Sequence, residues 1–339
     1  MFFRRTPPIR GPGFATLPGA LAAIEPLELG GTTQWTLTRG VDPTAPVVLL
    51  LHDGPGAAQI GLARSRHREL ERAFVVVDWD QRGSGLSWSR RLDPTSVTVD
   101  RLVEDALELS RVLAERFHRE RIVLSGHGWG GLLGILAAAR APEQFESLVV
   151  GSPVVDVGES DGRMYDWAVA EAERRGARSA QAELREIGAP PFRTAAQRRA
   201  VVRRVERLSA RPSPPEGPGL ADLLRIDEYT VWDLSKWRRG LAFSRERLGS
   251  DAMAVELPKR VRRLEVPTYF VAGREDHVND PSVARAYLQL LDAPRKGWAW
   301  IEGATHRVPF EEPDAYAAAL AHFVHEARAP EPPAWSLAG

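Results

Sequence analysis

The chain contains no cysteine among its 339 residues. This absence excludes disulfide bonds, thiolate nucleophiles and metal sites built from cysteine. No apolar run reaches the roughly 20 residues that a membrane-spanning helix needs. Neither sign of charge is in excess, since 45 Lys and Arg residues balance 45 Asp and Glu residues. We therefore expect a small molecule as the partner, and neither nucleic acid nor a membrane surface. The N-terminal residues show no apolar signal segment, so we expect a cytoplasmic location.

The chain does contain an alternation of strand-like and helix-like segments. Amphipathic helical patterns are clearest at residues 100–117, 281–291 and 313–324. Strand-like runs lie between the helical patterns, and several of them are continuous and apolar, which is typical of strands covered on both faces. These runs occupy residues 34–38, 47–51, 74–78, 122–124, 148–150, 268–271 and 299–301. The alternation predicts an α/β fold with a mostly parallel central sheet flanked by helices.

One long segment interrupts this alternation. Residues 153–263 carry no strand pattern and are rich in arginine and glutamate, with a proline-rich break at 211–219. We expect a core formed by residues 1–152 and 264–339, with residues 153–263 inserted as a helical cap domain. The segment includes an arginine-rich helix in which valines and a leucine alternate with the charges, and we interpret its arginines as a solvated helix face rather than a polyanion site. These arginines are Arg198, Arg199, Arg203, Arg204 and Arg207.

A glycine-rich turn separates the predicted strand at 122–124 from the helix that follows. Gly126-His127-Gly128-Trp129-Gly130 matches the nucleophile elbow G-x-S-x-G except that Gly128 stands in place of serine. Glycine adopts the positive φ of such a turn without strain. The same segment also fits the dinucleotide fingerprint G-x-G-x-x-G, but the next strand does not end in the acidic residue that binds a ribose. The elbow is therefore the preferred interpretation.

Two further motifs lie upstream of this turn. The first reads His52-Asp53-Gly54-Pro55-Gly56, and the second reads Asp80-Gln81-Arg82-Gly83-Ser84-Gly85 with Ser87. The chain thus resembles the proline iminopeptidase family of α/β-hydrolases, whose H-G-G-P-G, D-Q-R-G-S-G-x-S and G-x-S-W-G motifs occur in this order. The resemblance implies an α/β-hydrolase fold with a helical cap and an enzymatic function. Asp53 departs from the first motif, and Gly128 departs from the third.

The resemblance also implies the remaining site residues. The catalytic acid is expected after a late strand, where Asp276 lies, and the histidine in the loop after the last strand, where His306 lies. Asp276 could instead cap the next helix. The backbone N–H groups of Gly54 and Trp129 are the expected oxyanion hole. We expect the substrate to contact His52, Asp53, Tyr229, Trp232 and Tyr165. Neither a metal nor an organic cofactor is expected.

Asp53 bears on the reaction type. A carboxylate beside the oxyanion hole would oppose the negative charge that acyl transfer develops there. We therefore expect His306 and Asp276 to act as a general base on a small organic substrate without an acyl-enzyme. Candidate reactions are non-covalent hydrolysis, elimination, decarboxylation or a cyclisation in a biosynthetic pathway. Two alternatives remain open: a serine hydrolase whose nucleophile has been mutated to Gly128, and a small-molecule-binding protein without catalysis.

Overall fold

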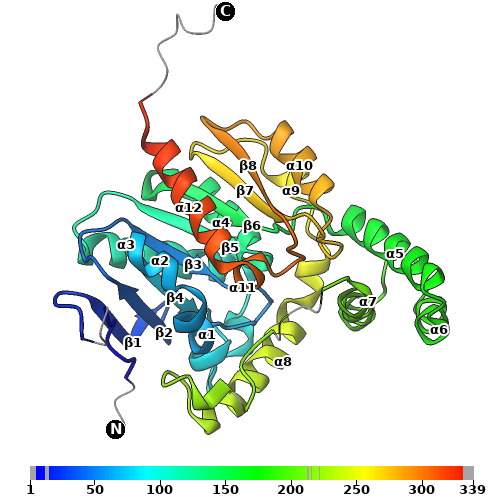
Figure 1. Ribbon diagram of the computed structural model, residues 1–339, viewed down its shortest axis with the longest axis horizontal. Coiled ribbons are helices and arrows are strands. Elements are labelled where there is room, and N and C mark those ends of the chain that lie inside the picture. The colour runs from blue at the N-terminus through cyan, green and yellow to red at the C-terminus, as the bar shows by residue number, and fades with distance from the viewer. Residues whose placement is uncertain (1–4, 12–14, 212–213, 215, 221, 331–339) are drawn as a thin grey trace, which may run out of the picture.

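The computed structural model describes residues 5–11, 15–211, 214, 216–220 and 222–330 (Figure 1). Within these residues, eight strands form one sheet in the order β1-β2-β4-β3-β5-β6-β7-β8. Strands β1 and β2 run antiparallel to their neighbours, and the other pairs are parallel. The strands are β1 (Leu21–Leu29), β2 (Thr32–Gly40), β3 (Val47–Leu51), β4 (Val75–Asp80), β5 (Ile122–His127), β6 (Phe145–Gly151), β7 (Thr268–Gly273) and β8 (Lys296–Ile301). The predicted fold class is confirmed.

The sequence pattern missed β1. This strand lies at the edge of the sheet, where half-buried and exposed residues alternate irregularly and Pro26 interrupts the apolar pattern. It is held by its pairing with β2 along its whole length, through a hairpin turn at Gly30 and Gly31. Both glycines have a positive φ, as a tight hairpin turn requires. Tertiary pairing, rather than local pattern, therefore defines this strand.

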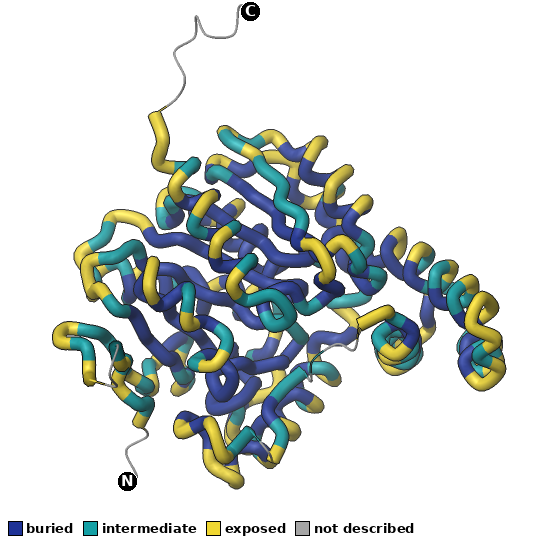
Figure 2. Tube along the Cα trace, in the orientation of Figure 1, coloured by how far each residue is buried: buried dark blue, intermediate teal, exposed yellow. Residues whose placement is uncertain are grey.

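Helices cover both faces of the sheet. One face packs against α3 (Val99–Arg116), α4 (Trp129–Arg140) and α10 (Pro281–Leu290). The other packs against α2 (Arg68–Ala73) and α12 (Pro313–Arg328). Figure 2 shows the resulting buried layer along the central strands. Because the central strands are buried on both faces, their sequences are continuous apolar runs rather than alternating ones. No helix of the described part of the chain is long and apolar enough to cross a membrane.

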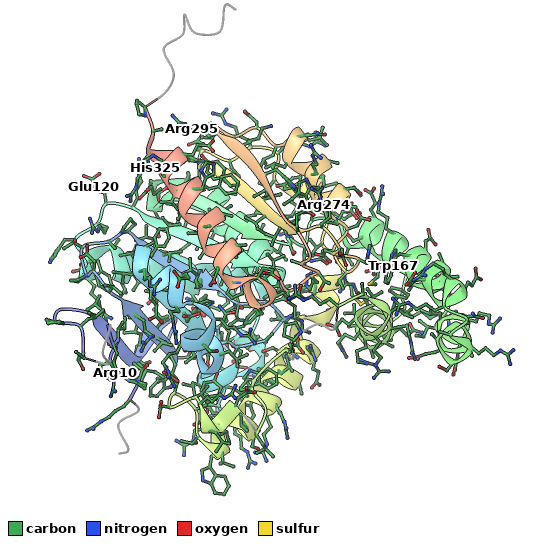
Figure 3. The ribbon with its side chains drawn as sticks, viewed as in Figure 1. Arg10, Glu120, Trp167, Arg274, Arg295 and His325 are labelled. Carbon is green, nitrogen blue, oxygen red and sulfur yellow. The ribbon has the colours of Figure 1, made fainter. Side chains whose placement is uncertain are left out.

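The chain between β6 and β7 is helical. Its helices are α5 (Val157–Arg174), α6 (Arg178–Ile187), α7 (Ala195–Leu208), α8 (Val231–Met253) and α9 (Leu257–Arg260). Figure 1 shows α5, α6 and α7 projecting beyond the sheet. These three helices share a small apolar core of their own. Trp167 on α5 stacks on His277 in the loop after β7, with ring centroids 4.0 Å apart (Figure 3). That stack ties the helical segment to the loop that carries Asp276.

The second sequence motif serves as a structural junction. Arg82 is almost fully buried and donates to both carboxylate oxygens of Asp105 on α3, at 2.6 and 2.9 Å. The same guanidinium donates to the carbonyl oxygens of Leu29 and Gly30 at 3.1 and 3.0 Å. The motif thereby joins the end of β4 to α3 and to the β1–β2 turn. A buried charge of this kind is stable only when it is paired and hydrogen-bonded, as Arg82 is here.

Candidate functional site

Gly128 forms the sharp turn between β5 and α4. Its φ is 51° and its ψ is −111°, and its N–H donates to the carbonyl oxygen of Gly151 at 2.9 Å. Gly130 lies so close to the carbonyl oxygens of Leu51 and His52 that a Cβ atom there would overlap with the backbone. The backbone therefore has the strand-to-helix turn that the elbow interpretation predicts.

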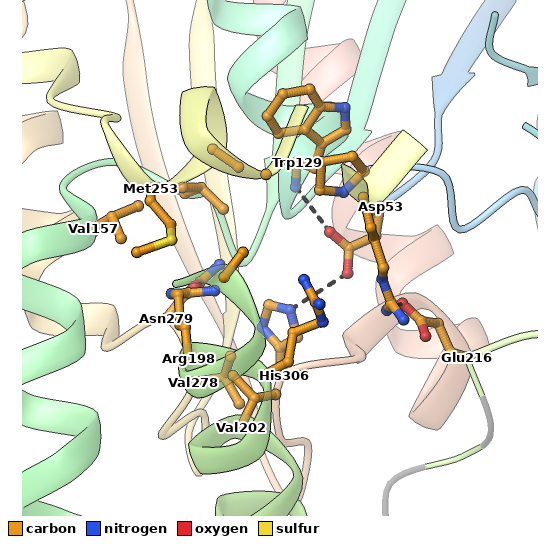
Figure 4. A pocket seen from close by; sticks show the side chains of 18 of the residues that line it. Asp53, Trp129, Val157, Arg198, Val202, Glu216, Met253, Val278, Asn279 and His306 are labelled. Atoms are coloured by element: carbon orange, nitrogen blue, oxygen red, sulfur yellow. Dashed lines mark hydrogen bonds and ion pairs between the residues drawn. The ribbon is translucent and has the colours of Figure 1, made fainter. Parts of the chain in front are cut away.

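The Asp53 carboxylate lies against this turn. Its Oδ1 accepts a hydrogen bond from the backbone N–H of Trp129 at 2.8 Å (Figure 4). A Cβ atom added to Gly128 would overlap with the same oxygen. The carboxylate thus occupies the space beside residue 128 and engages the N–H that the sequence assigned to an oxyanion hole. Gly54, the other expected contributor, lines the adjoining pocket.

His306 lies between two carboxylates. Its Nδ1 is 3.1 Å from Oδ2 of Asp276, and its Nε2 is 3.6 Å from Oδ2 of Asp53. Oδ1 of Asp276 accepts the backbone N–H groups of Val278 and Asn279, at 2.9 and 3.0 Å. These hydrogen bonds hold the carboxylate so that it can fix the orientation of the imidazole ring. Helix α10 is capped by Asp280, so Asp276 is not needed for that purpose.

The two carboxylates determine the protonation of His306. Burial alone would lower the pKa of His306, but Asp276 and Asp53 outweigh it and raise the pKa to about 10. Burial would likewise raise the pKa of Asp53, but contacts with His306, His127 and the Trp129 N–H bring it well below its usual range. Near neutral pH the free protein therefore holds an imidazolium between two ionised carboxylates. With its pKa raised in this way, His306 can donate a proton to a ligand before it accepts one. The general-base role expected from the sequence stays a prediction.

His127 completes this arrangement from the end of β5. Its Nε2–H donates to the carbonyl oxygen of His306 at 2.7 Å. Burial lowers its pKa, so the ring is neutral near pH 7. Its Nδ1 faces Oδ2 of Asp53 at 3.9 Å. Two imidazole rings therefore face one carboxylate oxygen of Asp53 at the floor of the pocket.

A cavity of about 190 Å³ adjoins these groups. Its floor is formed by the Asp53–Pro55 turn, Trp129 and His306. Valines from α5 and neighbouring loops line one wall, and α7 and α8 cover the cavity. The residues contributed by these two helices include Arg198, Arg199, Val202, Arg203, Glu206, Arg245, Gly249 and Met253. The cavity thus lies between the sheet core and the helical segment, where ligand sites commonly form.

Four of the expected substrate contacts lie outside this cavity. Tyr229 is buried and donates to Oδ2 of Asp80 at 2.6 Å, and Tyr165 donates to the carbonyl oxygen of Leu184 at 2.9 Å. Trp232 is 84% exposed on the outer surface of α8. His52 accepts the N–H of Gln81 and donates to the carbonyl oxygen of Asp53 at 2.6 Å. These side chains therefore have structural roles or face solvent, and of the expected contacts Asp53 alone lines the cavity.

The interpretation of the α7 arginines also needs correction. Arg198 and Arg199 are half-buried against the cavity, and Arg203 lines it while remaining exposed. Arg207 is exposed, and Arg204 pairs with Glu183. The sequence correctly separates the arginines from the apolar side of the helix. It contains no signal that this charged side covers the pocket, because that depends on how α7 packs above the core.

Comparisons with known proteins agree with this geometry. The family model for serine aminopeptidase, S33, matches residues 66–211. The probable aminopeptidase YbaC of Bacillus subtilis is 31% identical over 304 residues, which cover 89% of this chain and 96% of the relative. The chain belongs to the proline iminopeptidase-like family of α/β-hydrolases. Membership in this family makes it an enzyme of the α/β-hydrolase superfamily.

Solved structures of the family share the fold. A proline iminopeptidase-related protein from Thermus thermophilus superposes with a TM-score of 0.62 at 23% identity, covering 90% of this chain and 98% of that one. A proline iminopeptidase from Mycobacterium smegmatis gives a TM-score of 0.63 at 18% identity, with the same coverage. At these identities the likeness concerns the fold, and the reaction has to be argued from the site.

Proposed function

We propose that this protein catalyses proton transfer on a small organic substrate bound between the core and helices α7 and α8, without an acyl-enzyme at residue 128. His306 carries the proton, Asp276 orients its ring, and Asp53 supplies the opposing carboxylate. The observation that carries the proposal is the position of Asp53. Its Oδ1 accepts from the Trp129 N–H at 2.8 Å, and its Oδ2 lies 3.6 Å from His306 Nε2.

The same position bears on the class of reaction. Acyl transfer builds negative charge on an oxygen that backbone N–H groups must stabilise. Here a carboxylate already accepts the Trp129 N–H, and its charge would oppose a second anion at that point. Elimination, decarboxylation and cyclisation form no acyl-enzyme and need no tetrahedral oxyanion at the Trp129 N–H, so they fit the site better than acyl transfer does. Non-covalent hydrolysis would require Asp53 to leave the N–H group first.

A second candidate is a serine hydrolase whose nucleophile has been replaced by Gly128. The backbone of Gly128 supports it, because the turn retains a φ of 51° and a position directly before α4. The description of the Bacillus relative as a probable aminopeptidase supports it as well. Under this candidate the carboxylate of Asp53 would have to move once a serine stands at residue 128.

Hydrogen–deuterium exchange tests the proposed proton transfer whatever product the reaction forms. The protein would be incubated in D₂O with a panel of small oxo and hydroxy acids, and each compound examined by mass spectrometry. We expect deuterium incorporation or turnover of at least one compound, reduced at least about 100-fold in His306→Asn because general acid–base groups contribute that much or more. His322→Asn is the matched control, since His322 lies outside the cavity lining and is exposed on α12.

The results separate the candidates. Loss of exchange in His306→Asn with retention in His322→Asn supports the proposal. Undiminished exchange in His306→Asn contradicts it. Tight binding of a compound that the wild-type protein neither exchanges nor converts would instead favour a binding protein without catalysis.

A further inference from the structure

The cover of the cavity has a charge distribution that the proton-transfer chemistry does not require. Five arginines line the described part of the cavity, three from α7, one from α8, and Arg307 next to His306. Three of them form ion pairs. Arg307 pairs with Glu206 at 2.9 Å, Arg198 pairs with Asp161 at 2.6 Å, and Arg245 pairs with Glu216. The remaining two arginines, Arg199 and Arg203, belong to α7.

Arg199 and Arg203 lack acidic partners. Within the residues that the structure describes, neither guanidinium has a hydrogen bond or an ion pair with any group. They stand four residues apart on α7, so their side chains lie on the same helix face. Burial lowers the pKa of Arg199, the neighbouring charges of Arg245 and Arg203 lower it further, and Glu216 offsets these effects only in part. The helix therefore holds like charges together above the cavity, an arrangement that an anion would relieve.

Arg198 adds a donor on the adjacent side of the same helix. Its Nε donates to Oδ1 of Asp161 at 2.6 Å, which fixes the side chain. Its Nη2 is buried and has no hydrogen-bond partner among the described residues. Figure 4 shows Arg198 beside Val278 and Asn279 on the cavity wall. A buried donor without a partner is costly, and a bound acceptor would remove that cost.

The floor of the cavity carries the opposite sign. Asp53 is ionised there, and its pKa lies well below the usual range. A carboxylate ligand would be repelled by the floor and attracted by α7. The cavity thus orients a ligand that has one anionic end, because the cover and the floor prefer different groups.

We propose that the substrate is a small organic acid whose carboxylate binds Arg199 and Arg203, with Arg198 as an additional donor. Its reacting end extends toward Asp53 and His306. This inference names the substrate class for the proposed function, and rests on that function only for the position of the reacting end. It differs from recognition of a peptide amino terminus, which would require acidic groups not already paired, whereas Glu206 and Glu216 are paired with Arg307 and Arg245. Guanidinium groups suit carboxylates because their planar donors match two oxygens.

Binding measurements test the inference independently of catalysis. Isothermal titration calorimetry at low salt would compare a panel of straight-chain and phenyl-substituted carboxylates of two to ten carbons with their uncharged amides. In the wild-type protein at least one carboxylate should bind about tenfold or more tightly than its amide, the factor expected for a charge-assisted hydrogen bond. Raising the salt concentration should weaken this preference.

Two double variants test whether α7 causes the preference for a carboxylate over its amide. Arg199→Ala/Arg203→Ala should lose this preference, and Arg199→Lys/Arg203→Lys should retain most of it. The control Arg207→Ala/Arg238→Ala makes the same change in net charge at exposed positions of α7 and α8 outside the cavity lining. It should bind as the wild type does. Thermal unfolding of each variant identifies any that fail to fold. If the alanine variant does not fold, binding to the lysine variant is compared with binding to the wild type.

The outcomes are distinguishable from those of the proposed function. His306→Asn should keep the carboxylate preference even though it abolishes proton transfer, because His306 is not the anion's partner. The inference is overturned if no carboxylate binds more tightly than its amide, or if the preference survives in Arg199→Ala/Arg203→Ala. It is also overturned if His306→Asn alone removes the preference.

Discussion

At the scale of single residues, Gly128 and Asp53 form a matched pair. The carboxylate occupies space that any side chain at residue 128 would need, so each departure from the family motif makes room for the other. Changing one residue alone should therefore cost more than changing both. Sequence reasoning identified both departures, but it could not show that the two residues touch. That contact depends on how the turn after β3 packs against the start of α4.

We predict that Gly128→Ser alone lowers the free energy of unfolding by about 1–3 kcal/mol, because the new side chain meets Asp53. In Asp53→Gly/Gly128→Ser this cost should shrink to about 1 kcal/mol, the ordinary cost of a positive φ. Urea unfolding measures both values. The double variant should also react with a fluorophosphonate probe at least about tenfold faster than Gly128→Ser, because the Trp129 N–H is then free. Equal labelling of the two variants would show that Asp53 does not obstruct the turn.

At the scale of elements, the sequence predicts a helix better than it predicts what that helix covers. The arginines of α7 were correctly placed opposite its apolar side. Their position above the cavity follows from the packing of α7 on α5 and α8, which local periodicity does not encode. The motif at residues 80–87 differs, because the sequence identifies it as a family signature and does not show that its contacts stabilise the fold. Arg82 shows this most clearly through its two hydrogen bonds to Asp105.

We predict that Arg82→Met lowers the free energy of unfolding by about 3–5 kcal/mol, because it leaves the buried Asp105 without its main partner. The matched control is Arg140→Met, which removes an ion pair to Asp100 that is 2.7 Å long but exposed. Its cost should stay below about 1 kcal/mol. Urea denaturation at pH 7 measures both. Similar costs for the two substitutions would contradict a structural role for the motif.

At the scale of the whole molecule, the sheet and its covering helices follow closely from the sequence. Continuous apolar runs predicted every central strand, since strands buried on both faces need such runs. The strand that escaped prediction, β1, is an edge strand with one neighbour. The site was predicted in the same uneven way. Asp276 and His306 follow the last two strands, where the family motif order puts them, and they lie together as expected. The contacts that the inserted helices make with the cavity could not be predicted from the sequence.

The protonation of His306 makes the stability of the whole protein depend on alkaline pH. The pKa of His306 rises from its ordinary value of 6.5 to about 10 in the folded protein. The folded state therefore binds this proton more tightly than the unfolded state, and the stabilisation is complete below pH 6.5. It should be lost progressively as the pH rises from 6.5 to 10, by a total on the order of 5 kcal/mol. No cysteine is present to titrate in this interval.

His67 is a second group of this kind, because Asp78 outweighs the effect of burial and raises its pKa. The two histidines are separable by substitution. In His306→Asn, most of the decline in the free energy of unfolding between pH 6.5 and 10 should disappear, while His67→Asn should retain the larger part. Urea unfolding at intervals of one pH unit measures the slope for each protein. A wild-type curve that stays flat across this interval would mean that His306 is neutral near pH 7, and the site would then present a base from the outset.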